Sequence, residues 1–390
     1  MFTKNIKFKN FFGKKNFLIN KKLFNIFKKD SLLENYPLLM SLNKDYKYSY
    51  KKKDISRFKK FSSFNLIGMG GSILGSEAIY EFLNHKISKK FYFYNNLQNK
   101  KFFKSNDKKI NIIISKSGNT LETICNLNLI MKKQKKNKNL FITEKKNSFL
   151  FLIAKKLKAE IFEHKNFIGG RYSVLSEVGM LPAELMGLNE SKFKRFNELV
   201  KKKKFMNSLI KNVSFIASYI REGKYNSVIL NYDEKSNNLF KWYQQLTAES
   251  LGKKSKGIFP IISTMPKDNH SLLQLYLDGP KKNFFTFFSV KDNISNKLSK
   301  KNLSKKFDFL DEKNLNDILS SQKNATEIVF KRKKIPFRSF EILNRSEESI
   351  GELFCFFILE TILLGRLLKV NPFDQPSVES IKTETKKILI

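Results

Sequence analysis

The sequence lacks the residues from which several classes of site are built. Its two cysteines, Cys125 and Cys355, lie far apart and form no Cys-x-x-Cys pair or Cys/His cluster, which argues against a disulfide framework and a zinc site. No stretch approaches the roughly 20 apolar residues of a membrane span, because the most apolar one, 353–364, contains Glu360. These absences favour a soluble protein of the reducing cytoplasm that has no metal ion and no membrane partner.

Acidic residues are scarce beside basic ones, with 35 Asp and Glu against 75 Lys and Arg and a net charge of +40. Such an excess often marks a nucleic-acid or anionic-membrane partner. Here the lysines are spread along the chain and accompany abundant Asn and Ile and 39 Phe, which is typical of a codon bias towards A and T. We therefore expect no nucleic-acid partner, since that role would rest on charge alone. The positive field still favours the approach of phosphorylated substrates.

From about residue 61, apolar strand patterns alternate with helical ones, which predicts parallel α/β layers with ligands at the carboxyl ends of the strands. The first set of expected strands covers 64–70, 91–94, 110–115, 140–143 and 161–163, with helices over 72–83 and 119–133. After a helical connection over 173–221, the second set covers 227–231, 258–263, 284–290 and 337–343, with helices over 237–250, 270–277, 314–331, 346–369 and from about 375.

This pattern predicts three regions. Residues 1–60 form an N-terminal extension that is mostly helical; its first 29 residues hold nine lysines but no continuous apolar core, so we expect no targeting signal. Residues 61–205 and 206–390 form two similar domains, each a doubly wound parallel sheet in a three-layer αβα arrangement. The interface between two such domains is the expected place for a site.

A glycine-rich turn at 68–75 stands where the first strand leads into its helix, so a ligand can approach backbone N–H groups there. The dinucleotide pattern G-x-G-x-x-G fails, because Ile73 occupies the place of the third glycine. The following strand ends in Asn95-Asn96 and supplies no acid for a ribose. This argues against a nicotinamide cofactor, and a tight turn without a ligand stays the alternative.

Three hydroxyls follow the strand over 110–115, on Ser115, Ser117 and Thr120, and we call residues 115–120 the hydroxyl loop. The loop contains Gly118 and precedes a helix, where hydroxyls and free N–H groups can surround a phosphate dianion. It is not a Walker loop, because no G-K-[ST] follows. Helix capping would explain one hydroxyl but not three. The sequence therefore predicts a phosphate site here.

The Ser-x-Ser-Gly-x-Thr pattern of this loop resembles the signature of sugar isomerase (SIS) domains, which bind phosphosugars. Four further segments narrow the resemblance to the glucose-6-phosphate isomerase family, whose order and spacing they follow from about residue 64 to the C-terminus. They are GGRYS at 169–173, QQLTAES at 244–250, NHS at 269–271 with Gln274, and NPFDQ at 371–375 with Val378-Glu379 and Lys382. The resemblance implies two SIS domains and reversible isomerisation of glucose 6-phosphate and fructose 6-phosphate without metal or cofactor.

This reaction moves a proton between adjacent carbons through an enediolate, so it needs a base and a cation for the developing oxyanion. The resemblance implies that Glu249 is the base, that Arg171 stabilises the oxyanion, and that His270 and Lys382 share ring opening. In the family this histidine comes from the neighbouring subunit, which implies a homodimer with shared active sites. Each of the four, taken alone, also fits an ordinary structural or solvent-exposed side chain.

By the same resemblance, eight further residues hold the phosphosugar substrate. They are Gly71, Ser72, Ser115, Ser117, Thr120, Gly170, Gln245 and Gln375. The chain departs from the family at Asp268-Asn269, where Gly-Gln is common, and this leaves the positioning of His270 open. Pro376-Ser377 is a second departure, and the chain is shorter than most members.

Two alternative functions share this reading of the residues. One is a broader isomerase that also accepts mannose 6-phosphate, an aldose that would pass through the same enediolate. The other is a phosphosugar sensor without catalysis, which would need the hydroxyl loop but no base.

Overall fold

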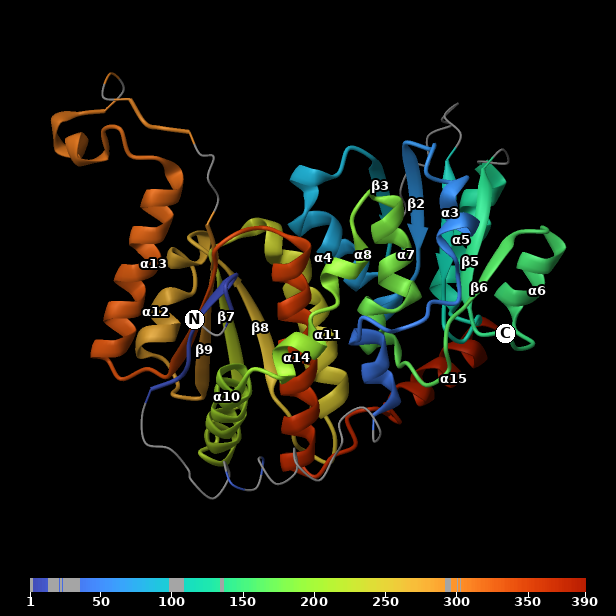
Figure 1. Ribbon diagram of the computed structural model, residues 1–390. Helices are drawn as coiled ribbons and strands as arrows, with labels where there is room; N and C mark the ends of the chain where they lie inside the picture. Colours follow the sequence, from blue (N-terminus) through green and yellow to red (C-terminus); the bar gives the residue numbers. More distant parts are fainter. Residues whose placement is uncertain are drawn as a thin grey trace.

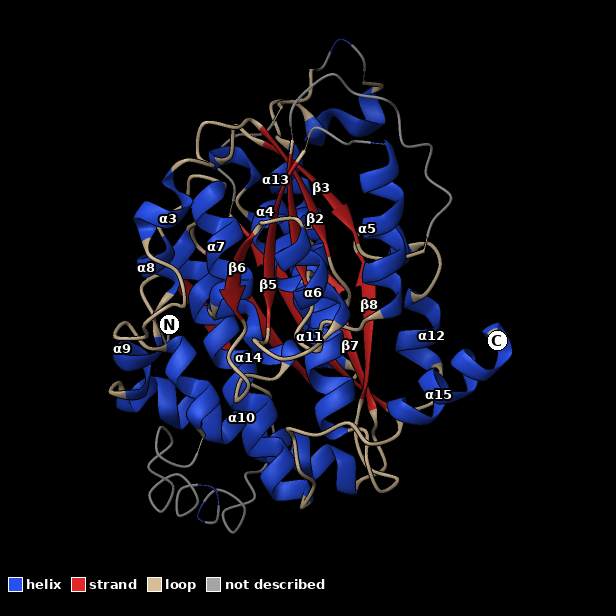
Figure 2. Ribbon diagram, turned by 90° about the vertical axis from the view of Figure 1, so that its right-hand side faces the viewer, coloured by secondary structure: helices blue, strands red, loops and turns tan. Residues whose placement is uncertain are grey.

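The computed structural model describes residues 3–12, 21, 23, 36–97, 109–133, 137–291, 296–299, 301 and 303–390. These residues form two five-stranded sheets. Figure 1 shows the sheets on opposite sides of a central group of helices, and Figure 2 shows helices on both faces of the strands. The α/β fold class predicted from the sequence is confirmed.

The first sheet has the order β3-β2-β4-β5-β6, and all its neighbouring strands are parallel. Every residue of β2 and β4 is buried, as expected for parallel strands that helices cover on both faces. Its strands are β2 (Ser63–Ile67), β3 (Lys90–Tyr94), β4 (Ile110–Ile114), β5 (Lys138–Thr143) and β6 (Glu160–Glu163), and its helices α4 (Leu74–Phe82), α5 (Leu121–Lys133) and α6 (Phe149–Lys156). The sequence predicted all of these except α6.

The second sheet has the order β1-β10-β9-β7-β8. Four strands are parallel, namely β7 (Asn226–Asn231), β8 (Phe259–Thr264), β9 (Asn283–Val290) and β10 (Phe337–Ile342). Around them lie α11 (Asn237–Leu251), α12 (Leu273–Asp278), α13 (Leu315–Arg332) and α14 (Glu347–Leu368), whereas α15 (Val378–Leu389) lies on the side of the first sheet in Figure 1. These strands and helices match the prediction to within a few residues.

The N-terminal region differs from its predicted helical character at β1 (Ile6–Lys9), which pairs antiparallel with β10. The segment alternates apolar and charged residues, and this is the pattern of a strand with one buried face. Ile6 is buried, and the ring of Phe8 packs 4.5 Å from that of Phe340. Residues 6–9 therefore belong to the second sheet, while the region's other described elements include the 3-10 helix η1 (Pro37–Leu42) and α3 (Lys52–Ser56).

The helical connection predicted between the two sheets is present. It consists of the 3-10 helix η4 (Gly170–Leu175) and helices α7 (Glu177–Leu185), α8 (Glu190–Phe193), α9 (Phe196–Val200) and α10 (Lys203–Arg221). The core beside it is formed largely by α14, in which every residue from Glu347 to Gly365 except Glu348 is buried. Within the described ranges, no helix has both the length and the apolar character to cross a membrane.

A buried lysine ties the N-terminal region to η4. The ammonium of Lys194 donates to the carbonyl oxygens of Ser41 and Leu175, and it lies 4.9 Å from the ring centres of Tyr46 and Tyr48. Burial lowers the pKa of Lys194 to about 7. Because Leu175 ends η4, this contact fixes one end of the segment that carries Arg171.

The lowered pKa of Lys194 predicts a pH-dependent stability. The unfolded chain keeps the lysine proton up to its ordinary pKa of 10.5, whereas the folded protein releases it near pH 7. Stability from this group therefore rises with pH between these values. We expect the free energy of unfolding of wild type, relative to Lys194→Met, to increase by about 2 kcal/mol from pH 7 to pH 9 in urea titrations. A difference that stays constant over this range would contradict the argument.

Candidate active site

The side chain of Arg171, the second residue of η4, is 2% exposed and lies against the end of α11. Its Nε donates to Ser250 Oγ at 2.8 Å and its Nη1 donates to Glu249 Oε2 at 3.1 Å. A buried guanidinium is stable only when its donors are paired, and these two bonds satisfy one side of it. Arg171 and Glu249, far apart in sequence, are thus in direct contact.

The other side of the same guanidinium binds the chain that precedes α15. Nη2 donates to the carbonyl oxygens of Pro372 at 2.7 Å and Asp374 at 3.0 Å, and Nη1 also donates to Gln375 Oε1. The Tyr172 hydroxyl adds a bond of 2.9 Å to the Pro372 carbonyl. Arg171 therefore brings the NPFDQ segment, including Gln375, to Glu249.

Glu249 stands in the last turn of α11 with its side chain 33% exposed. Its Oε1 accepts from Gln245 Nε2 at 2.9 Å, since residues four apart share one face of a helix. Its Oε2 accepts from Arg171. Both oxygens are therefore oriented, yet the carboxylate stays open to a ligand. This is an arrangement that can take a proton from a bound substrate.

Two glycine turns meet one another backbone to backbone, next to the Gln245 side chain that donates to Glu249. The 3-10 helix η2 (Gly70–Ser72) follows β2 and packs against η4. A Cβ atom placed on Gly71 would lie 2.2 Å from the carbonyl carbon of Gly170, and one on Gly70 would lie 2.6 Å from Gln245 Nε2. Gly70 also has a φ of +52°, which favours glycine. Gly71, Gly170 and Gln245 are thus brought together, while Ser72 ends η2 and is half-buried.

The hydroxyl loop follows β4, the neighbour of β2, so it lies at the same edge of the sheet as η2. Ser115 Oγ lies 2.8 Å from Thr120 Oγ1, and it accepts from the Gly118 N–H at 3.2 Å. Ser117 Oγ accepts from the backbone N–H of Asn119 at 3.2 Å. Gly118 has a φ of +69°, and a Cβ there would meet Ser148 Oγ at 2.1 Å. The three hydroxyls are thus gathered at one place, and their role in binding phosphate stays a prediction.

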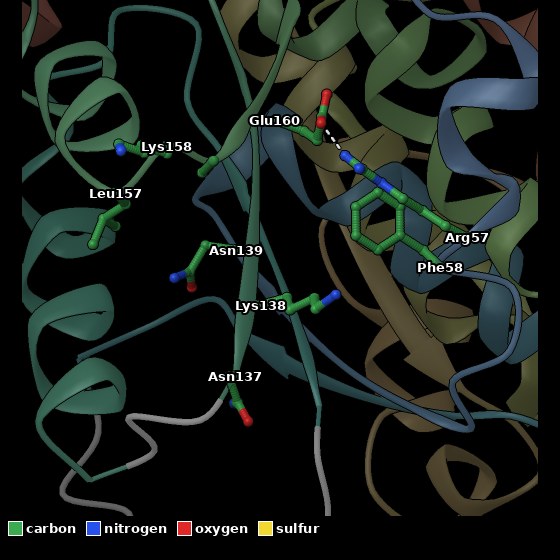
Figure 3. A pocket seen from close by; sticks show the side chains of 9 residues that line it. Arg57, Phe58, Asn137, Lys138, Asn139, Leu157, Lys158 and Glu160 are labelled. Atoms are coloured by element: carbon green, nitrogen blue, oxygen red, sulfur yellow. Dashed lines mark hydrogen bonds and ion pairs between the residues drawn. The ribbon is translucent and has the colours of Figure 1, made fainter.

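The surface has hollows at both ends of the strands of the first sheet, at their carboxyl ends and at their starts. One is lined by Lys116 of the hydroxyl loop together with Gly169, Tyr172 and Phe373, so it adjoins the segments just described. A different one, drawn in Figure 3, is lined by residues at the starts of β5 and β6, where Arg57 pairs with Glu160. Ligands of parallel sheets bind at the carboxyl ends of the strands. We therefore assign the chemistry to the end of the sheet that carries the hydroxyl loop.

Two of the predicted catalytic residues lie apart from Glu249. His270 is exposed after the 3-10 helix η6 (Lys267–Asn269), and Lys382 is exposed on α15, where it pairs with Glu379 at 2.6 Å. Within the described parts of the chain, neither has a hydrogen bond or ion pair to Glu249 or Arg171. α15 has no buried residue, and Figure 2 shows it extending from the body. The ring-opening roles of both residues stay predictions.

Two hydroxyls of the site, those of Ser250 and Tyr172, were not among the residues predicted from the sequence. Ser250 and Tyr172 are buried, and their oxygens lie 2.8 Å apart between Arg171 and the NPFDQ segment. Each directly follows a predicted residue inside a quoted motif, which was the available signal. Across the described ranges, no three His, Cys, Asp or Glu side chains are grouped as metal ligands.

A family model described as phosphoglucose isomerase matches residues 51–264. This chain belongs to the phosphoglucose isomerase family. The glucose-6-phosphate isomerase of Methanocaldococcus jannaschii is 34% identical over 355 residues, which cover 85% of this chain and 86% of that protein. The residues matched by the phosphoglucose isomerase model include Arg171, Glu249 and the hydroxyl loop, and they end before His270 and Lys382.

Solved structures share the fold of this phosphoglucose isomerase family member. A hypothetical protein of Thermus thermophilus superposes with a TM-score of 0.83 at 23% identity, covering 95% of this chain and 94% of that one. A glucose-6-phosphate isomerase of Chlamydia trachomatis gives a TM-score of 0.72 at 19% identity, covering 86% and 72%. At these identities the likeness shows the arrangement of strands and helices.

The close contact between Gly71 and Gly170 leaves no room for a methyl group, so adding one at Gly71 should push the two turns apart. Gly71→Ala should lower the free energy of unfolding by about 2 kcal/mol, because neither backbone can move aside without breaking the packing of η2 on η4. Gly169→Ala is the matched control, since a Cβ there meets only Tyr172 at 3.5 Å, and its effect should stay below about 0.5 kcal/mol. Equal stabilities of the two variants in urea unfolding would refute the close approach.

Proposed function

We propose that this chain interconverts glucose 6-phosphate and fructose 6-phosphate, as an aldose–ketose isomerase of the phosphoglucose isomerase family. The observation that carries the proposal is the Glu249 carboxylate, held between Arg171 and Gln245 but open to a ligand. Relatives that align over most of the chain are named glucose-6-phosphate isomerase. Both substrates are phosphosugars, the class for which the hydroxyl loop is suited.

In this proposal Glu249 takes the proton from C2 of the open-chain aldose, and the C–H electron pair forms the enediolate double bond. The negative charge that develops on the substrate oxygen faces the guanidinium of Arg171, whose charge is fixed at any physiological pH. Glu249 then returns the proton to C1, and transfer of the O2 proton to O1 restores a neutral hydroxyl at C1 and yields the ketose. One carboxylate serves both carbons because they are adjacent.

The remaining contacts position the substrate. We assign its phosphate to Ser115, Ser117 and Thr120, whose hydroxyls cluster before α5. Gly71, Ser72, Gly170, Gln245 and Gln375 are assigned to the sugar. The backbone N–H groups and small side chains of the two glycine turns allow the sugar hydroxyls to approach closely. No step calls for a cofactor.

We further propose that the active protein is a homodimer in which His270 completes the site of the partner. Within one chain His270 is exposed, and three large apolar side chains close to it in sequence are exposed as well: Phe259 (69%) and Ile261 on the edge strand β8, and Leu275 on α12. A second copy of the chain would cover them. Lys382 is assigned to ring opening beside His270.

The alternatives are separated by substrate and by chemistry. Activity on mannose 6-phosphate beside glucose 6-phosphate would identify the broader isomerase. A sensor would need no base, whereas Glu249 here is oriented by two donors. We place the enzyme in the cytoplasm, where phosphosugars are processed, with neither nucleic acid nor membrane as a partner; both cysteines of the chain are unpaired.

Replacing the base tests the reaction directly. Glu249→Gln keeps the size of the side chain and one acceptor oxygen but cannot accept the proton, so kcat should fall about 10³-fold. Binding of fructose 6-phosphate, measured by calorimetry, should stay within about tenfold of wild type. Glu222→Gln, on an exposed glutamate beside Lys224, is the control and should keep full activity. Isomerase activity that survives in Glu249→Gln would remove Glu249 as the base.

Mixing inactive variants tests the shared site. After subunit exchange, equal amounts of Glu249→Gln and His270→Ala should recover about a quarter of wild-type activity, because half of the dimers are mixed and one of their two sites is intact. Glu249→Gln mixed with Arg171→Ala should recover none, since these two residues act in the same chain. No recovery in the first mixture would show that His270 serves its own chain.

A further inference from the structure

The segment that carries His270 is held in its turn by hydrogen bonds to the carboxylate of Asp268. It runs from the end of β8 through η6 to the start of α12, and Asp268 lies at its centre, two residues before His270. Asp268 Oδ2 accepts from Ser263 Oγ at 2.8 Å and from the Thr264 N–H at 2.8 Å. Oδ1 accepts from Ser271 Oγ at 2.9 Å. One side chain thus joins the end of the strand to the residue after His270.

The backbone of the same turn is tied to Asp268 as well. The Leu272 N–H donates to the Asp268 carbonyl at 2.9 Å, and the His270 N–H donates to the Lys267 carbonyl at 3.1 Å. The His270 side chain, by contrast, is exposed. An exposed catalytic side chain is precise only when its backbone is fixed, and here most of the fixing contacts are made by Asp268.

We propose that Asp268 is the positioning residue of His270: its carboxylate locks the turn after β8 so that the imidazole projects at a defined place for ring opening. This rests on the proposed function, in which His270 acts on the substrate.

The geometry also predicts how substitutions differ. Alanine removes all three bonds of the side chain. Asparagine keeps one acceptor oxygen and presents N–H groups in place of the other, so it loses the bonds on one side of the turn. Ser271→Ala removes a single bond and leaves the carboxylate tied to the strand. The three variants form a graded series.

The test is a double-mutant cycle on isomerase activity. Asp268→Ala should lower kcat with fructose 6-phosphate about tenfold while KM stays within about threefold, with smaller losses for Asp268→Asn and Ser271→Ala. Combined with His270→Ala, Asp268→Ala should lower kcat by less than twofold further, because its effect passes through the histidine. Asp278→Ala, on an exposed aspartate of α12 that pairs with Lys333 at 2.7 Å, is the matched control.

Two outcomes would overturn the proposal. Full activity of Asp268→Ala would show that the turn holds without the carboxylate, and an equal loss in the presence and absence of His270 would show a role independent of the histidine. If Asp268→Ala fails to fold, Asp268→Asn and Ser271→Ala carry the same cycle. An inactive wild type would instead refute the proposed function. The results for the variants bear only on the role of Asp268.

Discussion

The buried guanidinium of Arg171 is the contact on which the site depends. It binds the end of α11 through Glu249 and Ser250, and it binds the chain before α15 through two carbonyls and Gln375. A buried arginine must have its donors satisfied, so segments distant in sequence are forced to meet at one point. The same charge then stands beside Glu249, where the proposed oxyanion would form. Structure and chemistry thus share one cation.

Close backbone contacts make this arrangement possible. Gly71 lies so close to Gly170 that a Cβ atom would not fit between them. A Cβ atom on Gly118 would likewise clash with Ser148. These contacts set η2 and η4 side by side and place the hydroxyl loop at the same edge of the first sheet. The glycines therefore position η2 and η4 as well as giving a ligand access. Where a glycine has no side chain, a substrate would meet backbone N–H groups.

The second sheet contributes through a different device. Its edge strand β8 leads into a turn that Asp268 closes with three hydrogen bonds, and the exposed His270 follows. In the hydroxyl loop, by contrast, the hydroxyls of Ser115 and Thr120 bond one another. In the proposed function the two loops therefore have different tasks: the hydroxyl loop would receive the phosphate, whereas the turn after β8 is filled by the carboxylate of Asp268.

The sequence by itself determined the parallel sheets, because short runs rich in isoleucine, such as INIII at Ile110–Ile114, are typical of strands that helices cover on both faces. It also determined the three hydroxyls of the loop after β4 and, through motif order, the family. It did not predict β1, whose partner β10 is more than 300 residues away, nor the bonds of Ser250 and Tyr172 to the arginine site. Only tertiary structure decided that Glu249 meets Arg171 while His270 and Lys382 stay at the surface, because such contacts depend on how distant segments pack and not on local pattern.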